Sequence, residues 1–227
     1  IFSKIGVKNS CFVEFGSGDG HECNTANLAV NFDWQGLHMD GSKKNVLSAK
    51  KYFGFIEHCL GKRLKVVIAQ EFITKENINS ILKKHKVSGE IDLLSIDIDG
   101  TDYWVWEAID CINPRVVVIE YNASFKSEKA VTVKYDPLFN RFLKHPSGMY
   151  HGASLAAMTK LARRKGYVLI GCESNGINAF FVRKDVVRKK FKELPPNKAY
   201  FPHKFRTNKL SVDQQFDIVK NCGLVEV

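Results

Sequence analysis

Apolar residues fall into short runs that alternate with segments of helical periodicity. A short apolar run bounded by glycine or polar residues is typical of a buried strand in a parallel sheet. Such runs predict strands over residues 11–15, 36–40, 64–69, 91–98, 116–121, 167–172 and 179–183. Between them, helices are predicted over residues 21–30, 43–60 after Ser42 as N-cap, from Thr74 or Asn77 onward, 103–109, 154–165 and 212–222.

This alternation predicts a Rossmann-like α/β fold with a seven-stranded, mostly parallel sheet and helices on both faces. The last two strands flank a turn at Ser174-Asn-Gly176, so we expect them to close the sheet as a C-terminal β-hairpin. Residues 122–150 show no periodicity, and connections of this length often carry lids or substrate contacts. We expect one domain over residues 1–190, with a basic extension, 191–227, packed on it or trailing from it.

The 227 residues carry a formal net charge of +10, and much of the excess lies late, as in Lys204 to Lys209. A solvated basic surface explains this charge, and so does an anionic partner such as nucleic acid or a phosphorylated sugar.

No apolar run approaches the roughly 18 residues of a membrane span. The six cysteines form no Cys-x-x-Cys pair, which argues against a zinc site. Cys11, Cys111 and Cys172 lie in or beside apolar runs, so we expect reduced core thiols and a cytoplasmic location. The chain starts at Ile1 rather than Met, which leaves room for residues before it, including a targeting signal.

The first apolar run leads into Val13-Glu-Phe-Gly-Ser-Gly-Asp-Gly20. Gly16, Gly18 and Gly20 permit a tight strand-to-helix turn and close approach of the backbone to a ligand. Asp40 ends the next apolar run, where a carboxylate can accept hydrogen bonds from ribose hydroxyls. The spacing therefore predicts a nucleoside-bearing cofactor at the carboxyl edge of the sheet.

The glycine motif, Asp40, the order of the strands and the closing hairpin together make residues 10–185 resemble the class I S-adenosylmethionine-dependent methyltransferases. The resemblance implies that the glycine loop lies against the methionine part of the cofactor, and that Glu14 fixes this loop and the cofactor's amino group. Ala69-Gln70-Glu71 falls where adenine is usually contacted, and Asp97 falls beside the methyl group. The cofactor-binding residues implied in this way are Glu14, Gly16, Gly18, Gly20, Asp40, Gln70 and Asp97.

Within that class, residues 91–100 followed by Val116-Val-Val-Ile-Glu120 resemble the FkbM-type branch, which is associated with O-methylation of sugars and natural products. That branch more often shows Asp-x-Glu-Gly where this chain has Asp97-Ile-Asp-Gly100. The Asn-Pro-Pro-Tyr and Asp-Pro-Pro-Tyr motifs of amide and base-amine methylation do not occur after the fourth strand. A sugar or other small-molecule hydroxyl is therefore the favoured acceptor, while the positive charge keeps RNA or another anionic substrate open. The oligomeric state is not indicated.

Acidic residues gather where the fourth and fifth predicted strands end. These strands are neighbours in the expected fold, so Asp97, Asp99 and Glu120 should converge at one edge. Such a cluster can act as a general base on a hydroxyl, or it can hold Mg²⁺, which prefers oxygen ligands. Asp102 is expected to cap the following helix, and His151, just before another helix, is a further candidate for a catalytic residue.

Two other hypotheses compete with a methyltransferase. Asp97-Ile-Asp-Gly-Thr101 matches the Asp-x-Asp-Gly-Thr motif of haloacid-dehalogenase-type phosphatases. That family normally places the motif near its N-terminus, whereas here two strand–helix units precede it. The other hypothesis is a non-catalytic protein that keeps the fold and the cofactor pocket, against which the retained Glu14, Asp40 and Asp97 argue.

Overall fold

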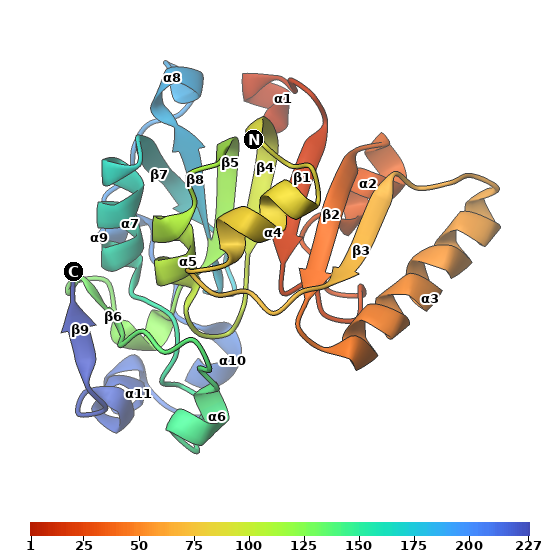
Figure 1. The fold of residues 1–227 in the computed structure, drawn as a ribbon. Helices are drawn as coiled ribbons and strands as arrows, with labels where there is room; N and C mark the ends of the chain where they lie inside the picture. Colours follow the sequence, from red (N-terminus) through yellow and green to blue (C-terminus); the bar gives the residue numbers. More distant parts are fainter. The chain divides into compact units, whose positions relative to one another are not determined.

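A computed structural model of the protein describes residues 1–227 and contains a seven-stranded sheet and a two-stranded sheet (Figure 1). The larger sheet consists of β1 (Cys11–Phe15), β2 (Gln35–Asp40), β3 (Val66–Gln70), β4 (Gly89–Ile96), β5 (Ile112–Glu120), β7 (Tyr167–Cys172) and β8 (Asn178–Arg183). Its order is β3-β2-β1-β4-β5-β8-β7. β1 is parallel to β2 and β4, and β2 is parallel to β3, whereas β8 is antiparallel to β5 and β7. The predicted fold class, including the closing hairpin, is confirmed.

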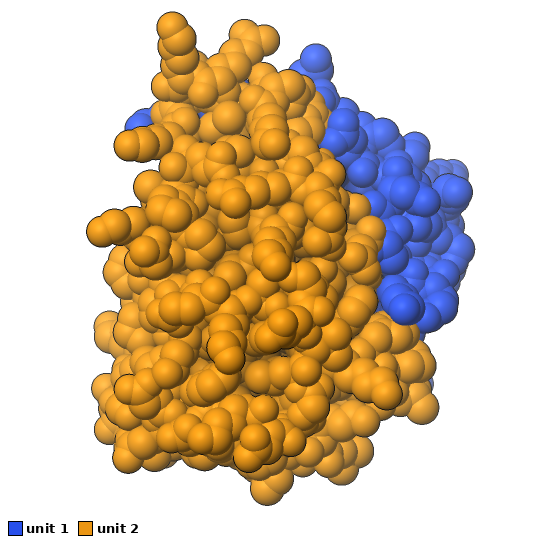
Figure 2. All heavy atoms as spheres, turned by 90° about the vertical axis from the view of Figure 1, so that its left-hand side faces the viewer, with its two compact units in different colours: residues 1–97, 108–115 blue, residues 98–107, 116–227 orange.

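The chain divides into two compact units (Figure 2). Unit 1 comprises residues 1–97 and 108–115, and unit 2 comprises residues 98–107 and 116–227. The helices of unit 1 are α1 (Phe2–Ile5), α2 (Ala26–Phe32), α3 (Lys43–Leu60) and α4 (Ile78–Lys84). None of the helices in the chain has the length and apolar character that a membrane crossing requires.

Unit 2 holds α5 (Asp102–Ala108) up to Glu107, the short helix η1 (Ala123–Phe125), β6 (Val131–Val133), α6 (Arg141–Lys144), α7 (Leu155–Arg164), α8 (Lys184–Val187), α9 (Pro196–Ala199), α10 (Lys204–Thr207), α11 (Val212–Val219) and β9 (Leu224–Glu226). β6 and β9 form the antiparallel two-stranded sheet. This pair was not predicted, because three-residue strands are too short to show a period in sequence.

The centre of unit 1 is built from β1 and β4, whose apolar side chains are buried on both faces of the sheet. α3 follows the prediction closely. The Ser42 hydroxyl accepts a hydrogen bond from Asn45 N at 3.3 Å, and Gly61 ends the helix in the left-handed conformation at φ 61°. In α4 the predicted apolar positions Ile78, Ile81 and Leu82 are all buried.

Several boundaries differ from the prediction for physical reasons. The helix predicted over residues 21–30 begins only at Ala26, and bends and turns occupy the residues before it. β4 ends at Ile96 rather than at residue 98, because Ile98 N donates to the Asp102 carboxylate and the chain turns there. β5 starts at Ile112, before the predicted start at residue 116, and it includes Pro114.

The C-terminal residues 191–227 take part in the core of unit 2. The Tyr121 hydroxyl donates to Phe201 O at 2.7 Å, and the Tyr200 hydroxyl donates to Ala123 O at 2.8 Å. Val219 is fully buried in an apolar cluster with Phe125 and with residues of β6. The extension is therefore attached to unit 2 by polar and apolar contacts.

Within unit 1, a buried ion pair holds the N-terminal segment against β4. Asp92, fully buried on β4, accepts hydrogen bonds from the backbone N–H groups of Lys8, Asn9 and Ser10 at 2.7–3.1 Å. Arg115 Nη1 donates to the same carboxylate at 2.5 Å and to Gly6 O at 2.9 Å. Removing the carboxylate would leave a buried guanidinium and three N–H groups without their acceptor.

We expect Asp92→Ala to lower the free energy of unfolding by about 3–5 kcal/mol, as for other broken buried ion pairs. Urea denaturation at pH 7 measures the change. Asp110→Ala is the matched control, because Asp110 is exposed, and it should change stability by less than about 0.5 kcal/mol. Equal stabilities of the two variants would contradict the role assigned to Asp92.

Candidate functional site

The glycine loop follows β1 and is fastened to the ends of β2 and β4. Gly16 N and Ser17 N donate to Met39 O at 2.8 and 3.2 Å, and Asp97 N donates to Phe15 O at 3.2 Å. Within unit 1 the structure thus brings together all seven residues for which the resemblance implied cofactor contacts: Glu14, Gly16, Gly18, Gly20, Asp40, Gln70 and Asp97.

Two glycines of the loop meet different requirements. Gly18 has φ 57°, and a Cβ built on it would meet no atom within 4 Å, so its backbone borders open space. Gly20 has φ 92°, and a Cβ there would come within 3.1 Å of the Phe53 ring and 3.3 Å of Ala49. Gly18 therefore leaves room for a ligand, whereas Gly20 allows the loop to pack against α3.

Glu14 lies beneath the loop and holds it from inside unit 1. Its buried carboxylate accepts hydrogen bonds from Asn24 N at 2.8 Å, Thr25 N at 3.0 Å and the Thr25 hydroxyl at 2.5 Å. Burial is the main cause that raises the pKa of Glu14, and these hydrogen bonds oppose it. These contacts explain the late start of α2, because residues 24 and 25 are turned toward Glu14.

A buried histidine completes this hydrogen-bond chain. His38 Nε2 lies 2.7 Å from the Thr25 hydroxyl, which itself donates to Glu14, so Nε2–H donates to Thr25. Burial lowers the pKa of His38 to about 4, so the ring is neutral at pH 7. The nearby Cys23 thiol donates to Gly20 O at 2.9 Å, and burial raises its pKa to about 12. Glu14, Cys23 and His38 have ligand atoms within 4.8 Å of one another, but the Glu14 carboxylate and the Cys23 thiol are already engaged in hydrogen bonds with the loop.

Asp40 joins the loop to α3. Its Oδ2 accepts a hydrogen bond from Gly18 N at 3.0 Å, and its Oδ1 accepts from Ser42 N at 2.8 Å and from Asn45 Nδ2 at 3.2 Å. An ionised carboxylate offers about four acceptor positions, so Asp40 keeps capacity for a further donor. The neighbouring strand places Gln70 opposite Asp40, with its side chain exposed.

Ser17 is a residue of this loop that sequence reasoning did not single out. Its side chain is buried, and its hydroxyl has no hydrogen-bond partner in the protein. Buried polar groups are normally paired, so this hydroxyl is a place where a polar group of a ligand would be stabilised. The available signal was a small polar residue between two loop glycines.

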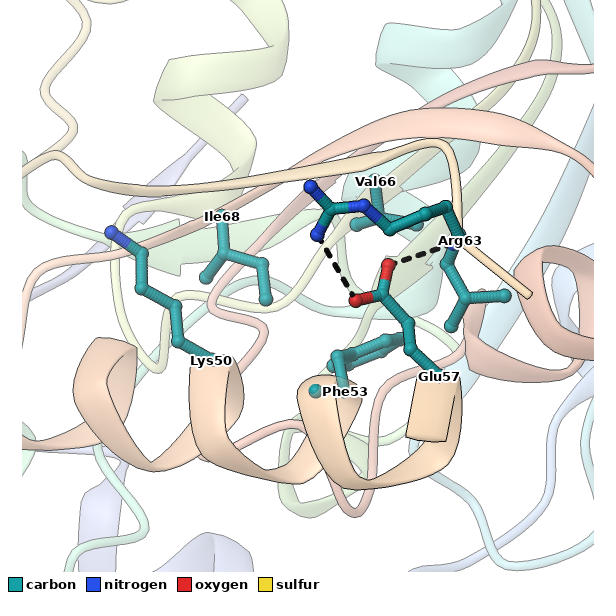
Figure 3. A pocket seen from close by; sticks show the side chains of 8 residues that line it. Lys50, Phe53, Glu57, Arg63, Val66 and Ile68 are labelled. Carbon is teal, nitrogen blue, oxygen red and sulfur yellow. Dashed lines mark hydrogen bonds and ion pairs between the residues drawn. The ribbon is translucent and has the colours of Figure 1, made fainter. Parts of the chain in front are cut away.

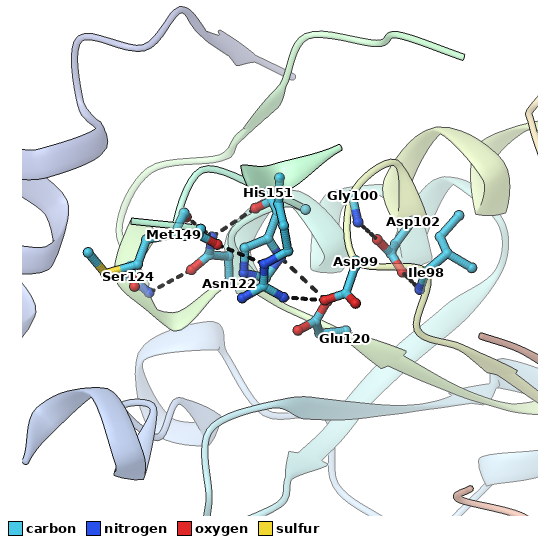
Figure 4. Close-up of polar contacts among 12 residues, drawn as sticks. Ile98, Asp99, Gly100, Asp102, Glu120, Asn122, Ser124, Met149 and His151 are labelled. Carbon is cyan, nitrogen blue, oxygen red and sulfur yellow. Dashed lines mark hydrogen bonds and ion pairs between the residues drawn. The ribbon is translucent and has the colours of Figure 1, made fainter. Parts of the chain in front are cut away.

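The other predicted catalytic residues lie in unit 2, at the end of β5 (Figure 4). Glu120 is the last residue of this strand, and Asn122 follows it. Asn122 Nδ2 donates to Met149 O at 2.7 Å and to His151 O at 2.8 Å. This clamp brings His151 Nδ1 to 3.5 Å from Glu120 Oε2, and neither atom has a hydrogen-bond partner.

Asp99 and Asp102 have different environments. Asp102 is fully buried, and its carboxylate accepts from Ile98 N at 2.8 Å and Gly100 N at 3.0 Å, so it holds the turn that leads into α5. Asp99 has φ 56°, in the left-handed region, and its carboxylate is paired with Arg141.

Close packing also fixes this turn. A Cβ built on Gly100 would come within 2.4 Å of the Phe139 ring, and Gly100 O accepts from Gly152 N at 2.8 Å. The turn that carries Asp99 is therefore set by its neighbours.

Two arginines that sequence reasoning missed shape the electrostatics of this cluster. Burial, followed by the charges of Asp102 and Asp99, raises the pKa of Glu120 well above its ordinary value, while Arg141 and Arg206 oppose the shift. Burial and the same two arginines lower the pKa of His151 to about 3. At neutral pH the histidine is uncharged, and Glu120 is a stronger base than an ordinary glutamate.

The group formed by Asp99, Glu120 and His151 does not support a Mg²⁺ site. Asp99, Glu120 and His151 have ligand atoms within 4.8 Å of one another, but Arg141 already pairs with Asp99. Arg206 donates to His151 Nε2 at 2.9 Å, which leaves the ring proton on Nδ1, the atom that faces Glu120. A protonated nitrogen cannot bind a metal, so no catalytic step is assigned to one here.

A separate groove of about 440 Å³ lies in unit 1 between α3 and β3 (Figure 3). Phe53, Val66 and Ile68 line it, and Arg63 Nη1 lies 3.6 Å from the Glu57 carboxylate at its border. None of the predicted cofactor-binding residues contributes to this groove. It is therefore distinct from the glycine loop.

Comparison with known proteins finds distant likenesses only. No protein-family model matches the chain, and no curated protein matches it. A solved S-adenosylmethionine-dependent methyltransferase from Clostridium acetobutylicum ATCC 824 is 11% identical, with a TM-score of 0.48, over 80% of this chain and 87% of that chain. One from Aquifex aeolicus is 13% identical, with a TM-score of 0.45, over 79% and 85%.

A third solved structure is the O-methyltransferase NcsB1 from neocarzinostatin biosynthesis, in complex with S-adenosylmethionine and 2-hydroxy-5-methyl naphthoic acid. It is 14% identical, with a TM-score of 0.44, over 77% of this chain and 49% of that chain. Likenesses this distant do not assign a function, which has to rest on the residues of this chain.

The buried His38 predicts a pH dependence of stability. Its pKa falls from 6.5 to about 4 on folding, so its contribution is fully present above pH 6.5 and is lost as the pH falls through 4. At pH 4 the loss amounts to about 3 kcal/mol. In urea denaturation between pH 7 and pH 4, His38→Gln should flatten this decline, whereas His58→Gln, on the exposed His58, should not. Parallel curves for wild type and His38→Gln would contradict the assignment.

Proposed function

We propose that the protein is an S-adenosylmethionine-dependent methyltransferase that methylates a hydroxyl group of a sugar or another small molecule. The observation that carries this proposal is the glycine loop after β1. It is fastened to Asp40, open at Gly18, and leaves the Ser17 hydroxyl buried without a partner. These features suit a ligand with a ribose and a polar tail held against the backbone.

The residues of unit 1 divide the cofactor between them in this proposal. Asp40, with its remaining acceptor capacity, would hold the ribose hydroxyls, and Gln70 on the adjacent strand would contact the adenine. Ser17 and the loop backbone would bind the polar groups of the methionine part. Glu14, whose carboxylate is occupied by the loop, would act by keeping this backbone in place. When bound, S-adenosylmethionine supplies a methyl group already activated by the sulfonium.

The acceptor chemistry rests on Glu120 in unit 2. Its Oε2 is buried and has no hydrogen-bond partner, and its raised pKa makes it a stronger base than an ordinary glutamate. In the proposed step the acceptor hydroxyl loses its proton to Glu120, and the oxygen takes the methyl group as the sulfonium becomes a thioether. His151 contributes as a neutral neighbour of the carboxylate rather than as the base.

The contacts in the site do not support the competing hypotheses. A phosphatase would need Asp99 as acid and base, but Arg141 occupies that carboxylate. An RNA substrate is supported by the net charge of +10 alone. The FkbM-type branch remains part of the proposal on its sequence motif, and the six free cysteines support a reducing, cytoplasmic location.

Asp40→Ala should weaken the binding of S-adenosylmethionine and S-adenosylhomocysteine more than tenfold, because the ribose loses a carboxylate acceptor. Titration calorimetry measures both affinities. Asp110→Ala, which changes an exposed aspartate, should bind as wild type does. Unchanged affinity of the Asp40 variant would remove the assigned ribose site, and absence of binding to the folded wild type would end the methyltransferase proposal.

Glu120→Gln should lower turnover at least 100-fold while cofactor affinity stays within about twofold, because the base is lost but the loop is untouched. Release of S-adenosylhomocysteine with a panel of sugars and phenols provides the readout. Glu193→Gln, at a half-exposed carboxylate that pairs with Arg163, is the control. Wild-type activity should fall as the pH drops through the raised Glu120 pKa. A Glu120→Gln enzyme with normal turnover would exclude the proposed base.

A further inference from the structure

Arg206 lies in the basic run from Lys204 to Lys209, yet its side chain turns into unit 2. Its Nη1 donates to Asn122 Oδ1 and to the Ser124 hydroxyl, both at 3.1 Å, and its Nη2 lies 2.9 Å from His151 Nε2. All three partners are neutral. Burial lowers the pKa of the guanidinium, but its ordinary value is so high that the charge persists.

The contact between Arg206 and His151 determines where the histidine proton lies. A guanidinium has donors only, so His151 Nε2 must be the acceptor. A neutral imidazole whose Nε2 accepts carries its hydrogen on Nδ1. Nδ1 is the atom that faces Glu120 Oε2 at 3.5 Å. In the other tautomer, two N–H groups would oppose each other at Arg206, and a lone pair would face the carboxylate.

We propose that Arg206 is a positioning residue for the Glu120 base, because its guanidinium fixes His151 in the tautomer that directs Nδ1–H at Glu120. The catalytic role assigned to Arg206 rests on the proposed function, whereas the tautomer of His151 does not depend on that function. An N–H that faces the carboxylate at this distance favours its ionised form, whereas the lone pair of the other tautomer would oppose it. A residue of the C-terminal extension thereby acts on the base through a second side chain.

The rest of the hydrogen-bond network supports this geometry. Asn122 Oδ1 accepts from Arg206, and its amide nitrogen fixes the backbone of His151, so one side chain aligns both partners. The Ser124 hydroxyl donates to Gln215 Oε1 at 2.8 Å, which leaves its oxygen free to accept from Arg206. The charged or titratable groups that face His151 are Asp99, Asp102, Glu120, Arg141, His203 and Arg206.

The direct test is the nitrogen spectrum of His151 in the full chain labelled with ¹⁵N-histidine, at pH 7. The His151 signals are identified by their loss in His151→Asn. We expect a pyridine-like Nε2 and a pyrrole-like Nδ1 in the wild type. In Arg206→Met at least half of the molecules should carry the proton on Nε2, whereas Lys204→Met, on the exposed outer side of α10, should match wild type.

A wild-type His151 with its proton on Nε2 overturns the inference, and so does an Arg206→Met spectrum identical to wild type. If Arg206→Met does not fold, the wild-type spectrum still tests which nitrogen of His151 carries the proton.

In turnover assays Arg206→Met should lower kcat at least tenfold without changing cofactor affinity, and the acid limb of its pH profile should move to higher pH. Failure of the wild type to release S-adenosylhomocysteine would refute the proposed function but leave the tautomer measurement valid.

Discussion

The recurring interaction in this protein is a carboxylate that accepts backbone N–H groups near a strand or in a turn. Asp92 holds the N-terminal segment in this way, Glu14 the entry to α2, Asp40 the glycine loop, and Asp102 the turn into α5. Each acid satisfies donors that the irregular chain would otherwise leave unpaired, and buried unpaired donors are costly. The irregular connections that surround the proposed sites owe their shape to these acids.

Against this background, Glu120 is an exception. It also ends a strand and is buried, but its Oε2 has no hydrogen-bond partner. The nitrogen His151 Nδ1 lies 3.5 Å from this oxygen. A carboxylate that is not used to hold the chain is available for chemistry, and this difference separates Glu120 from the structural acids.

The sequence predicted the regular parts of the fold well because period and capping are local properties. β1 and β7 have the predicted bounds, and Ser42 caps α3 as expected. The β6–β9 pair could not be predicted, since partners 91–95 residues apart leave no local pattern. For Asp102 the sequence predicted a cap of the following helix, whereas its carboxylate accepts from Ile98 N and Gly100 N in the preceding turn. No local pattern shows which donors an acidic side chain will meet.

Arg206 illustrates the limit for the site most clearly. In the sequence it is one of several basic residues in a run that suggested an anionic partner. Only its hydrogen bonds to Asn122, Ser124 and His151 distinguish it from its neighbours, and no local pattern encodes them. Ser17 and Arg141 were missed for the same reason, whereas the glycine spacing and Asp40 were recognised because both lie within one strand–helix–strand segment.

The contact between Gly100 and Phe139 constrains how this protein can vary. A side chain at position 100 has no space while the Phe139 ring occupies it. Position 100 can therefore gain a side chain in relatives only where position 139 has become small, and the two positions should change together. Engineering that aims to reshape the turn carrying Asp99 should treat them as one unit and substitute both at once.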